Sequence, residues 1–174
     1  MSDEILDSFR EDPHLGVGDS APWLSSATSN DIYRPSGWTF RAGETARICL
    51  ALARIDPEIS ATPGAELLIE WFTALSDVTN AVKFYVKLFS FAPGGATAKL
   101  NPSSADFTAA LDTSVSQVSQ GANLLNVASV TIPSGLCVAR NKLIGIIERN
   151  DSDVADTISG EVRIMDVLFQ ANKA

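Results

Sequence analysis

The sequence is poor in the residues from which most catalytic and metal sites are built. It holds one histidine, His14, and two cysteines, Cys49 and Cys137, which lie far apart. A Ser-His-Asp or Cys-His site needs an imidazole held rigidly beside its nucleophile. His14 lies instead in an acidic stretch broken by Pro and Gly. A zinc site of the usual ligand sets cannot be assembled from these three residues. The sequence therefore predicts no catalytic residues, no metal ligands and no cofactor.

Positive charge is also scarce. Lys and Arg number 13 against 21 Asp and Glu, so the formal net charge is 13 − 21 = −8. Duplex DNA and anionic membranes attract the opposite balance, so neither nucleic acid nor a membrane is an expected partner. No apolar run approaches the roughly 18 residues of a membrane span, and the acidic start lacks the features of a secretory signal. Charged residues make up 20 % of the chain, which suggests that a neighbour covers part of the surface.

The two cysteines lie within or beside apolar runs. In a chain made and kept inside the cell, Cys49 and Cys137 are expected to be buried free thiols. In a secreted chain, a Cys49–Cys137 disulfide is the alternative, and the sequence does not supply the geometry that decides it.

The first 37 residues show no regular hydrophobic pattern, because Pro and Gly interrupt them repeatedly. A short helix over residues 3–10, capped by Ser2, is predicted there, and the remainder of 1–37 is predicted to form an extended N-terminal arm. A solvated tail does not need apolar anchors. This arm carries six of them: Phe9, Leu15, Trp23, Leu24, Ile32 and Tyr33. It therefore requires a groove, on its own domain or, as favoured here, on a neighbouring subunit.

From residue 38 to residue 174 the apolar residues alternate with a period of two, which is typical of half-buried β-strands. In the clearest case, Leu67, Ile69 and Trp71 share one face. Seven or eight strands and little helix are predicted, including Thr45–Ile55, Glu66–Thr73, Val82–Phe91, Phe107–Val118, Leu124–Ile132, Lys142–Arg149 and Glu161–Phe169. Their spacing favours one all-β domain, an antiparallel β-sandwich, behind the arm.

Several strands carry apolar residues on both faces. The residues expected to point outward, opposite core residues such as Ile164 and Leu168, are Phe72, Phe89, Phe91, Val167 and Phe169. The outer faces of a sandwich are normally polar, so the arm, loops or another copy of the chain is expected to cover them. Scattered surface apolar residues are the alternative. A subunit interface is favoured, with Phe72, Phe89 and Phe91 joining the arm anchors as interface candidates.

Two arrangements of carboxylates are candidate sites of chemistry. Glu70 and Glu148 could form the pair that glycoside hydrolysis needs, although single acidic residues on strands are far more often solvated. Asp151, Asp153 and Asp156 form an acidic loop that is the best calcium candidate, because Ca²⁺ takes six to eight oxygen ligands. The loop lacks the EF-hand pattern, so a solvated hairpin loop is the favoured interpretation.

Parts of the sequence resemble a family of small jelly-roll proteins encoded among the structural genes of tailed bacteriophages. The similar stretches are Glu66–Phe72, Leu143–Asp151, Asp156–Val162 and a last strand ending near Phe169. In that family a strand ends in an arginine followed by an acidic residue, and a loop of the type D-x-x-x-D-T-[LI]-x-G-[DE] leads into the final strand. Here Asn150 separates Arg149 from Asp151, and the loop Asp151–Glu161 is similar. The resemblance covers roughly residues 40–170 and leaves the arm outside it.

The resemblance implies a jelly-roll fold and a non-enzymatic role in a tailed-phage virion. The first hypothesis is a capsid decoration (cement) protein that self-associates, as a homotrimer, and grips neighbouring subunits with its arm. Its expected partners are copies of itself and the major capsid protein or other virion proteins, after assembly in the host bacterial cytoplasm.

The alternative is a tail-fibre or tail-associated adhesin or carbohydrate-binding module. Its candidate aromatic contacts are Trp23, Tyr33 and Trp38, whereas Trp71 is expected in the core. A hydrolase built on a β-sandwich is the weakest hypothesis, because the sequence places no histidine or carboxylate pair for it.

Overall fold

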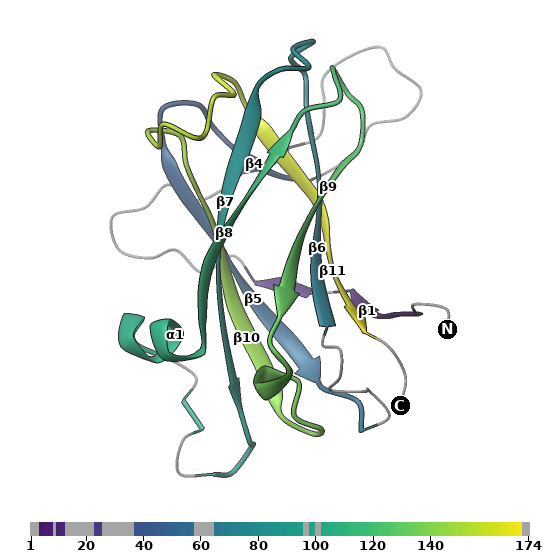
Figure 1. The fold of residues 1–174 in the computed structure, drawn as a ribbon, viewed down its shortest axis with the longest axis vertical. Helices are drawn as coiled ribbons and strands as arrows, with labels where there is room; N and C mark the ends of the chain where they lie inside the picture. The colour runs from purple at the N-terminus through teal and green to yellow at the C-terminus, as the bar shows by residue number, and fades with distance from the viewer. Residues whose placement is uncertain are drawn as a thin grey trace.

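The fold is an all-β sandwich of two antiparallel sheets (Figure 1). The computed structural model describes residues 4–8, 10–12, 23–25, 37–57, 65–95, 98–99 and 102–171; within these, 4–8, 10–12, 23–25, 37, 51–53 and 108–109 are described by their backbone alone. The main strands are β4 (Gly37–Phe40), β5 (Thr45–Arg54), β6 (Ala65–Thr73), β7 (Ala81–Phe91), β8 (Leu111–Val118), β9 (Asn126–Ile132), β10 (Lys142–Asn150) and β11 (Val162–Ala171).

The order of the strands defines a jelly roll. One sheet contains β4-β11-β6-β9 and the other contains β5-β10-β7-β8, and every pairing is antiparallel. The chain crosses from one sheet to the other at every connection from β4 onward except β7–β8. Eight strands arranged in this way form two interlocked Greek keys. The predicted antiparallel β-sandwich, or jelly roll, is therefore confirmed.

The core lies between the two sheets and follows the predicted alternation. Leu67, Ile69 and Trp71 of β6 are fully buried, as are the inward residues of β7. The Phe84 ring of β7 contacts the Trp71 and Phe40 rings edge-on, at centroid distances of 6.1 and 6.4 Å. Trp71 is a core residue, as predicted from its position on the strand.

Strand β11 departs from the predicted alternation. Its register against β6 shifts between Ile164 and Asp166, which marks a β-bulge. A bulge inserts one extra residue and reverses which side chains face inward beyond it. Val167 and Phe169 therefore face the core together with Ile164. The expectation that these two residues lie on the outer face is wrong, because it assumed an unbroken period of two.

A short helix covers part of the outer face of the second sheet. Helix α1 (Ser104–Ala110) occupies the start of the segment predicted as a strand from residue 107, and its N-cap residue Ser103 forms a capping box with Asp106. The Phe107 ring of α1 meets the Phe89 ring edge-on, with the ring centroids 6.4 Å apart. The Phe89 ring in turn stacks on the Phe91 ring, with the centroids 6.1 Å apart. Phe91 is buried and Phe89 is half-buried, so this chain itself covers two residues expected at a subunit interface.

The third outward phenylalanine is covered in the same way. Phe72 is buried, and the Arg163 guanidinium lies 5.7 Å from its ring centroid. A neighbouring copy is therefore not needed to cover Phe72.

In the described part of the chain, no helix has the length and apolarity of a membrane-crossing segment. Cys137 is buried and Cys49 is half-buried, and neither cysteine forms a disulfide bond.

Three short strands within the first 37 residues pair with the sandwich of the same chain. Strand β1 (Glu4–Ser8) pairs with β11, β2 (Arg10–Asp12) with β5, and β3 (Trp23–Ser25) with β4. The helix predicted over residues 3–10 is therefore wrong, because backbone pairing with β11 outweighs the local capping signal. The side chains of the arm anchors lie outside the described residues: Phe9, Leu15, Trp23, Leu24, Ile32 and Tyr33.

Candidate functional site

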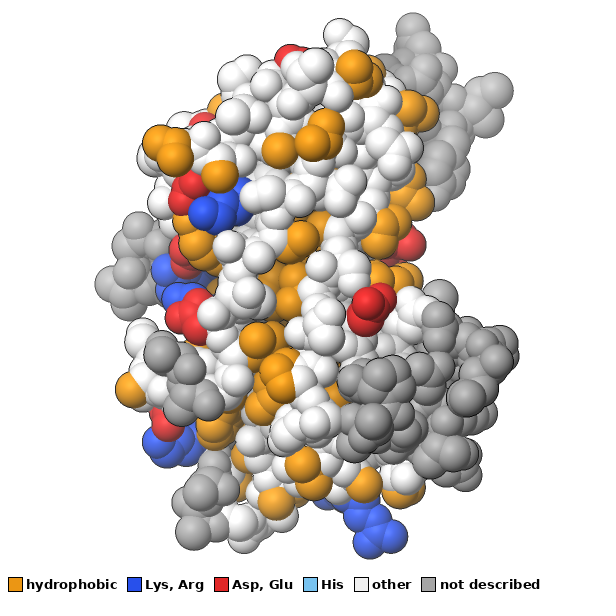
Figure 2. All heavy atoms as spheres, viewed as in Figure 1, with side chains coloured by type: hydrophobic (Ala, Val, Ile, Leu, Met, Phe, Trp, Pro, Cys, Tyr) orange, Lys and Arg blue, Asp and Glu red, His pale blue; other side chains and the backbone are white. Residues whose placement is uncertain are grey.

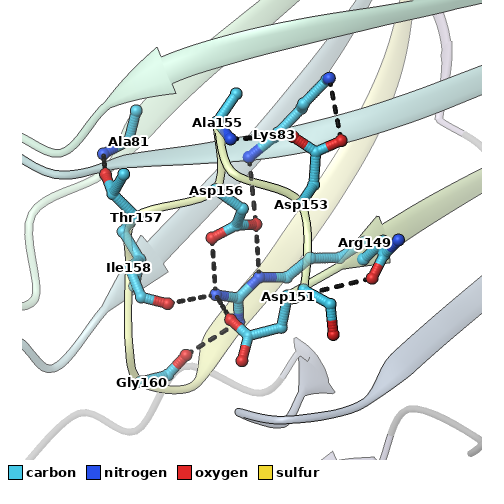
Figure 3. Close-up of polar contacts among 12 residues, drawn as sticks. Ala81, Lys83, Arg149, Asp151, Asp153, Ala155, Asp156, Thr157, Ile158 and Gly160 are labelled. Carbon is cyan, nitrogen blue, oxygen red and sulfur yellow. Dashed lines mark hydrogen bonds and ion pairs between the residues drawn. The ribbon is translucent and has the colours of Figure 1, made fainter.

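Arg149 organises the most extensive polar network of the described structure (Figure 3). Its side chain is fully buried at the end of β10, on the same face as Leu143 and Ile147. The guanidinium forms a bidentate pair with Asp156, with Nε to Oδ2 at 2.8 Å and Nη2 to Oδ1 at 2.9 Å. Nη2 also donates to Asp151 Oδ1 at 2.7 Å. Because both carboxylates lie in the 151–161 loop, one buried cation holds the loop against the end of the sandwich.

The same guanidinium satisfies backbone groups of the loop. Nη1 donates to the Gly160 carbonyl at 2.8 Å, and Nη2 donates to the Ile158 carbonyl. The loop is tied to the start of β7 as well, since the Thr157 amide donates to the Ala81 carbonyl at 2.8 Å and the Ala81 amide donates to Thr157 Oγ1 at 2.9 Å. Buried polar groups are costly unless paired, and here each of these groups has a partner. The network therefore holds the loop in one shape by pairing its polar groups within the chain.

The three aspartates proposed as a calcium site do not converge. Asp151 and Asp156 pair with Arg149, whereas Asp153 accepts hydrogen bonds from the Tyr85 hydroxyl and from Lys83 Nζ. The Tyr85 hydrogen bond, with the Ala155 amide and Lys83, lowers the pKa of Asp153 to about 2. Across the described ranges, no group of three or more His, Cys, Asp or Glu residues is placed to hold a metal ion. The calcium candidate is thus replaced by ion pairs within the chain.

The structure also separates the proposed carboxylate pair. Glu70 lies on β6 of one sheet, whereas Glu148 lies on β10 of the other and forms an ion pair with Arg47 at 3.0 Å. Both residues alternate with core residues, so they face away from each other on opposite outer faces. They cannot act on one glycosidic bond. His14 lies outside the described residues.

A second feature was not predicted from the sequence: a group of exposed apolar side chains around the connection from β8 to β9. The group, here called the apical cluster, consists of Leu124 and Leu125 of that connection and Val78 of the β6–β7 loop. Each of these residues is between 51 and 57 % exposed. A methyl group placed on Gly121 would lie 3.6 Å from the side chains of both Val78 and Leu124, so these two are neighbours. Apolar residues grouped in this way mark interaction surfaces more often than scattered ones do.

The loop that carries the two leucines of the apical cluster, residues 119–125, is held in place by hydrogen bonds. Buried Asn126 accepts from the Gln120 amide at 2.8 Å and donates to the Leu124 carbonyl at 2.9 Å. The Asn123 amide donates to the Thr73 carbonyl at 2.7 Å. Gly121 adopts a φ of 126°, which only glycine reaches without strain. The exposed leucines are therefore presented on a fixed loop.

Figure 2 shows the same end of the molecule from the side of β8 and β9. Hydrophobic side chains stand at its upper end and continue downward through the middle of this view, with few charged side chains among them. Leu111 and Val115 of β8 are only partly buried, although they pack against the core. The side of the molecule shown in Figure 2 therefore carries exposed apolar surface with few charges among it.

The aromatic residues proposed for carbohydrate stacking are only partly described. Trp38 is buried in the core, so its ring is not available to a ligand in this structure. Trp23 belongs to β3, whose side chains are not described, and Tyr33 lies outside the described residues.

Comparison with known proteins adds little to these observations. No protein-family model matches the chain, and no curated protein does. Among solved structures, the chain is similar to a Xyl-CBM35 module in complex with a glucuronic acid containing disaccharide, with 12 % identity, a TM-score of 0.39, and coverage of 99 % of this chain and 97 % of the other. It is also similar to the CBM35 of Abf62 from Cellvibrio japonicus, with 13 % identity, a TM-score of 0.36 and coverage of 99 and 91 %. The jelly-roll assignment rests on the strand order described above.

Proposed function

We propose that this chain is a non-catalytic jelly-roll building block that assembles with copies of itself through its β8–β9 side. The apical cluster is the observation that carries this function. Leu124 and Leu125 stay about half exposed on a loop that Asn126 holds in place, so the chain does not fold them away. Burying such residues against a partner stabilises association by about 25 cal/mol per Å² of apolar area, before association costs are subtracted.

The site of assembly is a finer part of the same proposal. The sequence resemblance to structural proteins of tailed bacteriophages supports a virion component, with capsid decoration as the first role. The structural comparisons do not extend that resemblance. The jelly roll also carries lectin domains, so a carbohydrate-binding module is the alternative that the fold itself allows.

Self-association is tested by the native mass of the purified full chain over a range of concentrations, with a Leu124→Ser/Leu125→Ser variant beside it. We expect the natural chain to form a defined oligomer and the double variant to dissociate at a concentration at least tenfold higher than the natural chain does. Val154 is the matched control, because it is 95 % exposed on the 151–161 loop, outside the apical cluster. Val154→Ser is expected to leave the oligomer unchanged.

Two outcomes would refute the assembly function. One is a natural chain that stays monomeric at high concentration. The other is a monomer that binds members of a glycan array, which would support the carbohydrate-binding alternative instead.

A further inference from the structure

The two sides of the sandwich differ in how their strand edges are treated. On one side, β1 pairs with β11, β2 with β5 and β3 with β4, so short strands of the same chain cover the edges. On the other side, β8 and β9 end their sheets, and within the described ranges no strand pairs with their outer edges. An unpaired edge presents a row of backbone N–H and C=O groups that can pair with another chain.

Strand β9 lacks the devices with which proteins protect such an edge. Its seven residues, Asn126–Ile132, include no charged residue and no proline, and its register against β6 is unbroken by a bulge. Lysine, proline and bulges are the usual protections of an edge strand. Four of its residues are β-branched, which favours strand pairing. Strand β8 carries a charge on its exposed face, Asp112, whose carboxylate lies 3.8 Å from Lys87 Nζ.

The exposed face of β9 is complementary to itself. Val127, Ser129 and Thr131 point outward and alternate with buried Ala128 and Val130. If two copies of β9 run antiparallel with Ser129 at the twofold axis, Ser129 faces Ser129 of the second copy and Val127 faces Thr131 of the second copy. Paired hydroxyls and paired β-branched side chains both favour antiparallel pairing. On the inner face, Ala128 then lies opposite Val130 of the second copy.

The acidic residues beside β9 do not oppose this pairing. Glu66 and Glu70 of β6 lie next to Thr131 and Val127 in the ladder. Across the twofold axis, Glu70 would be three strand spacings, about 14 Å, from Glu66 of the second copy. That separation exceeds the Debye length of about 8 Å at physiological salt, so the repulsion is largely screened.

From these observations we infer that β9 pairs with β9 of a second copy of this chain, antiparallel about a twofold axis at Ser129. This inference rests on the proposed function and adds to it the partner strand and the register. The sheet β4-β11-β6-β9 then continues without interruption into the same sheet of the second copy. Such an isologous contact closes on itself and yields a dimer or an assembly of dimers. It thereby differs from the trimer expected at the sequence level.

Cysteine cross-linking of the full chain tests the register directly. In a Cys49→Ser/Cys137→Ala background, Ser129→Cys would place two thiols face to face at the axis. Directly opposed residues of an antiparallel pair lie about 4.5–5.5 Å apart, within the range that a disulfide bridges. We expect mild oxidation to convert most of this variant into a covalent dimer on a non-reducing gel. Ser114→Cys, an exposed serine on β8, is the matched control and is expected to stay monomeric.

A charge substitution gives a second, independent measurement. Ser129→Lys in the natural sequence would bring two ammonium groups together at the axis, and we expect the dimer dissociation constant to rise at least tenfold, with no change for Ser114→Lys. Equal cross-linking of the two cysteine variants, or a native trimer that Ser129→Lys does not disturb, would overturn the β9 pairing and leave the assembly function intact. A natural chain that is monomeric throughout would overturn both.

Discussion

Replacing Arg149 by methionine is the most informative test of how the sandwich is held at its 151–161 end. Methionine preserves much of the apolar stem but removes all five hydrogen bonds that the guanidinium donates. Among the described residues, the fully buried Asp156 carboxylate would then keep one side-chain hydrogen bond, at 3.2 Å from the Lys83 amide. The carbonyls of Ile158 and Gly160 would lose their Arg149 donors.

The expected cost follows from that orphaned carboxylate. Removing one partner of a buried ion pair destabilises a protein by about 3–5 kcal/mol, a large fraction of the roughly 5–15 kcal/mol that holds a domain folded. With a denaturant slope of about 2 kcal/mol per molar urea, the unfolding midpoint of Arg149→Met should fall by roughly 1.5–2.5 M. Urea unfolding followed by tryptophan fluorescence measures this shift.

Lys87→Met is the matched control. Lys87 pairs with Asp112 at 3.8 Å on a partly exposed face, and such pairs contribute about 0–1 kcal/mol. Its midpoint should therefore move by less than about 0.5 M. If Arg149→Met moved the midpoint no further than Lys87→Met does, the buried network would not be what stabilises this end.

A double-mutant cycle keeps the test decisive if Arg149→Met fails to fold. Asp156→Asn preserves the shape of the carboxylate and removes its charge. We expect Arg149→Met/Asp156→Asn to be less destabilised than the sum of the single variants, because no buried charge is then left without a partner. Strict additivity would contradict the coupling.

Three further variants probe other parts of the fold. Gly145→Ala should cost about 1–3 kcal/mol in urea unfolding, because the added Cβ would lie 2.5 Å from Leu88 Cδ2 in the core; an unchanged midpoint would contradict this packing. The Tyr85 hydroxyl helps hold the pKa of Asp153 at about 2 in the folded chain. The ionised Asp153 carboxylate therefore stabilises the fold fully above its pKa in the unfolded chain, near 3.9, and this stabilisation is lost as the pH falls through about 2. Asp153→Asn should therefore flatten this part of the stability–pH profile, and identical acid profiles would contradict the contact. Ser103→Ala should destabilise by about 1 kcal/mol in thermal unfolding, through loss of the α1 cap, and no change would show that the cap is unimportant.

Much of the sandwich was predictable because the signal for strands is local. Alternation with a period of two identified β6, β7 and β10 and placed Leu67, Ile69 and Trp71 in the core. The same parity could have shown that Arg149 faces inward, since it lies six residues after Leu143 on one face of β10. The scarcity of histidine and cysteine was likewise a property of the sequence alone.

Local patterns were misleading where a longer-range contact decided the outcome. The bulge in β11 turns Phe169 inward, and it is visible only in the register against β6. Ser2 offers a capping signal for a helix over residues 3–10, yet residues 4–8 form a strand because they pair with the end of β11. The calcium hypothesis treated Asp151 and Asp153 as neighbours, although each pairs with a different cation.

What the sequence determined by itself is that β5, β6, β7, β9, β10 and β11 are strands, because alternation with a period of two is a pattern of residues two positions apart. The tertiary structure decided which edges are covered, which carboxylates are paired and which apolar residues stay exposed. Those features depend on residues far apart in the chain: the Gly43 amide, for example, donates to Asp151, 108 residues away. The edge of β9, with which no described strand pairs, and the exposed apical cluster both follow from which distant segments of the chain pair with each other.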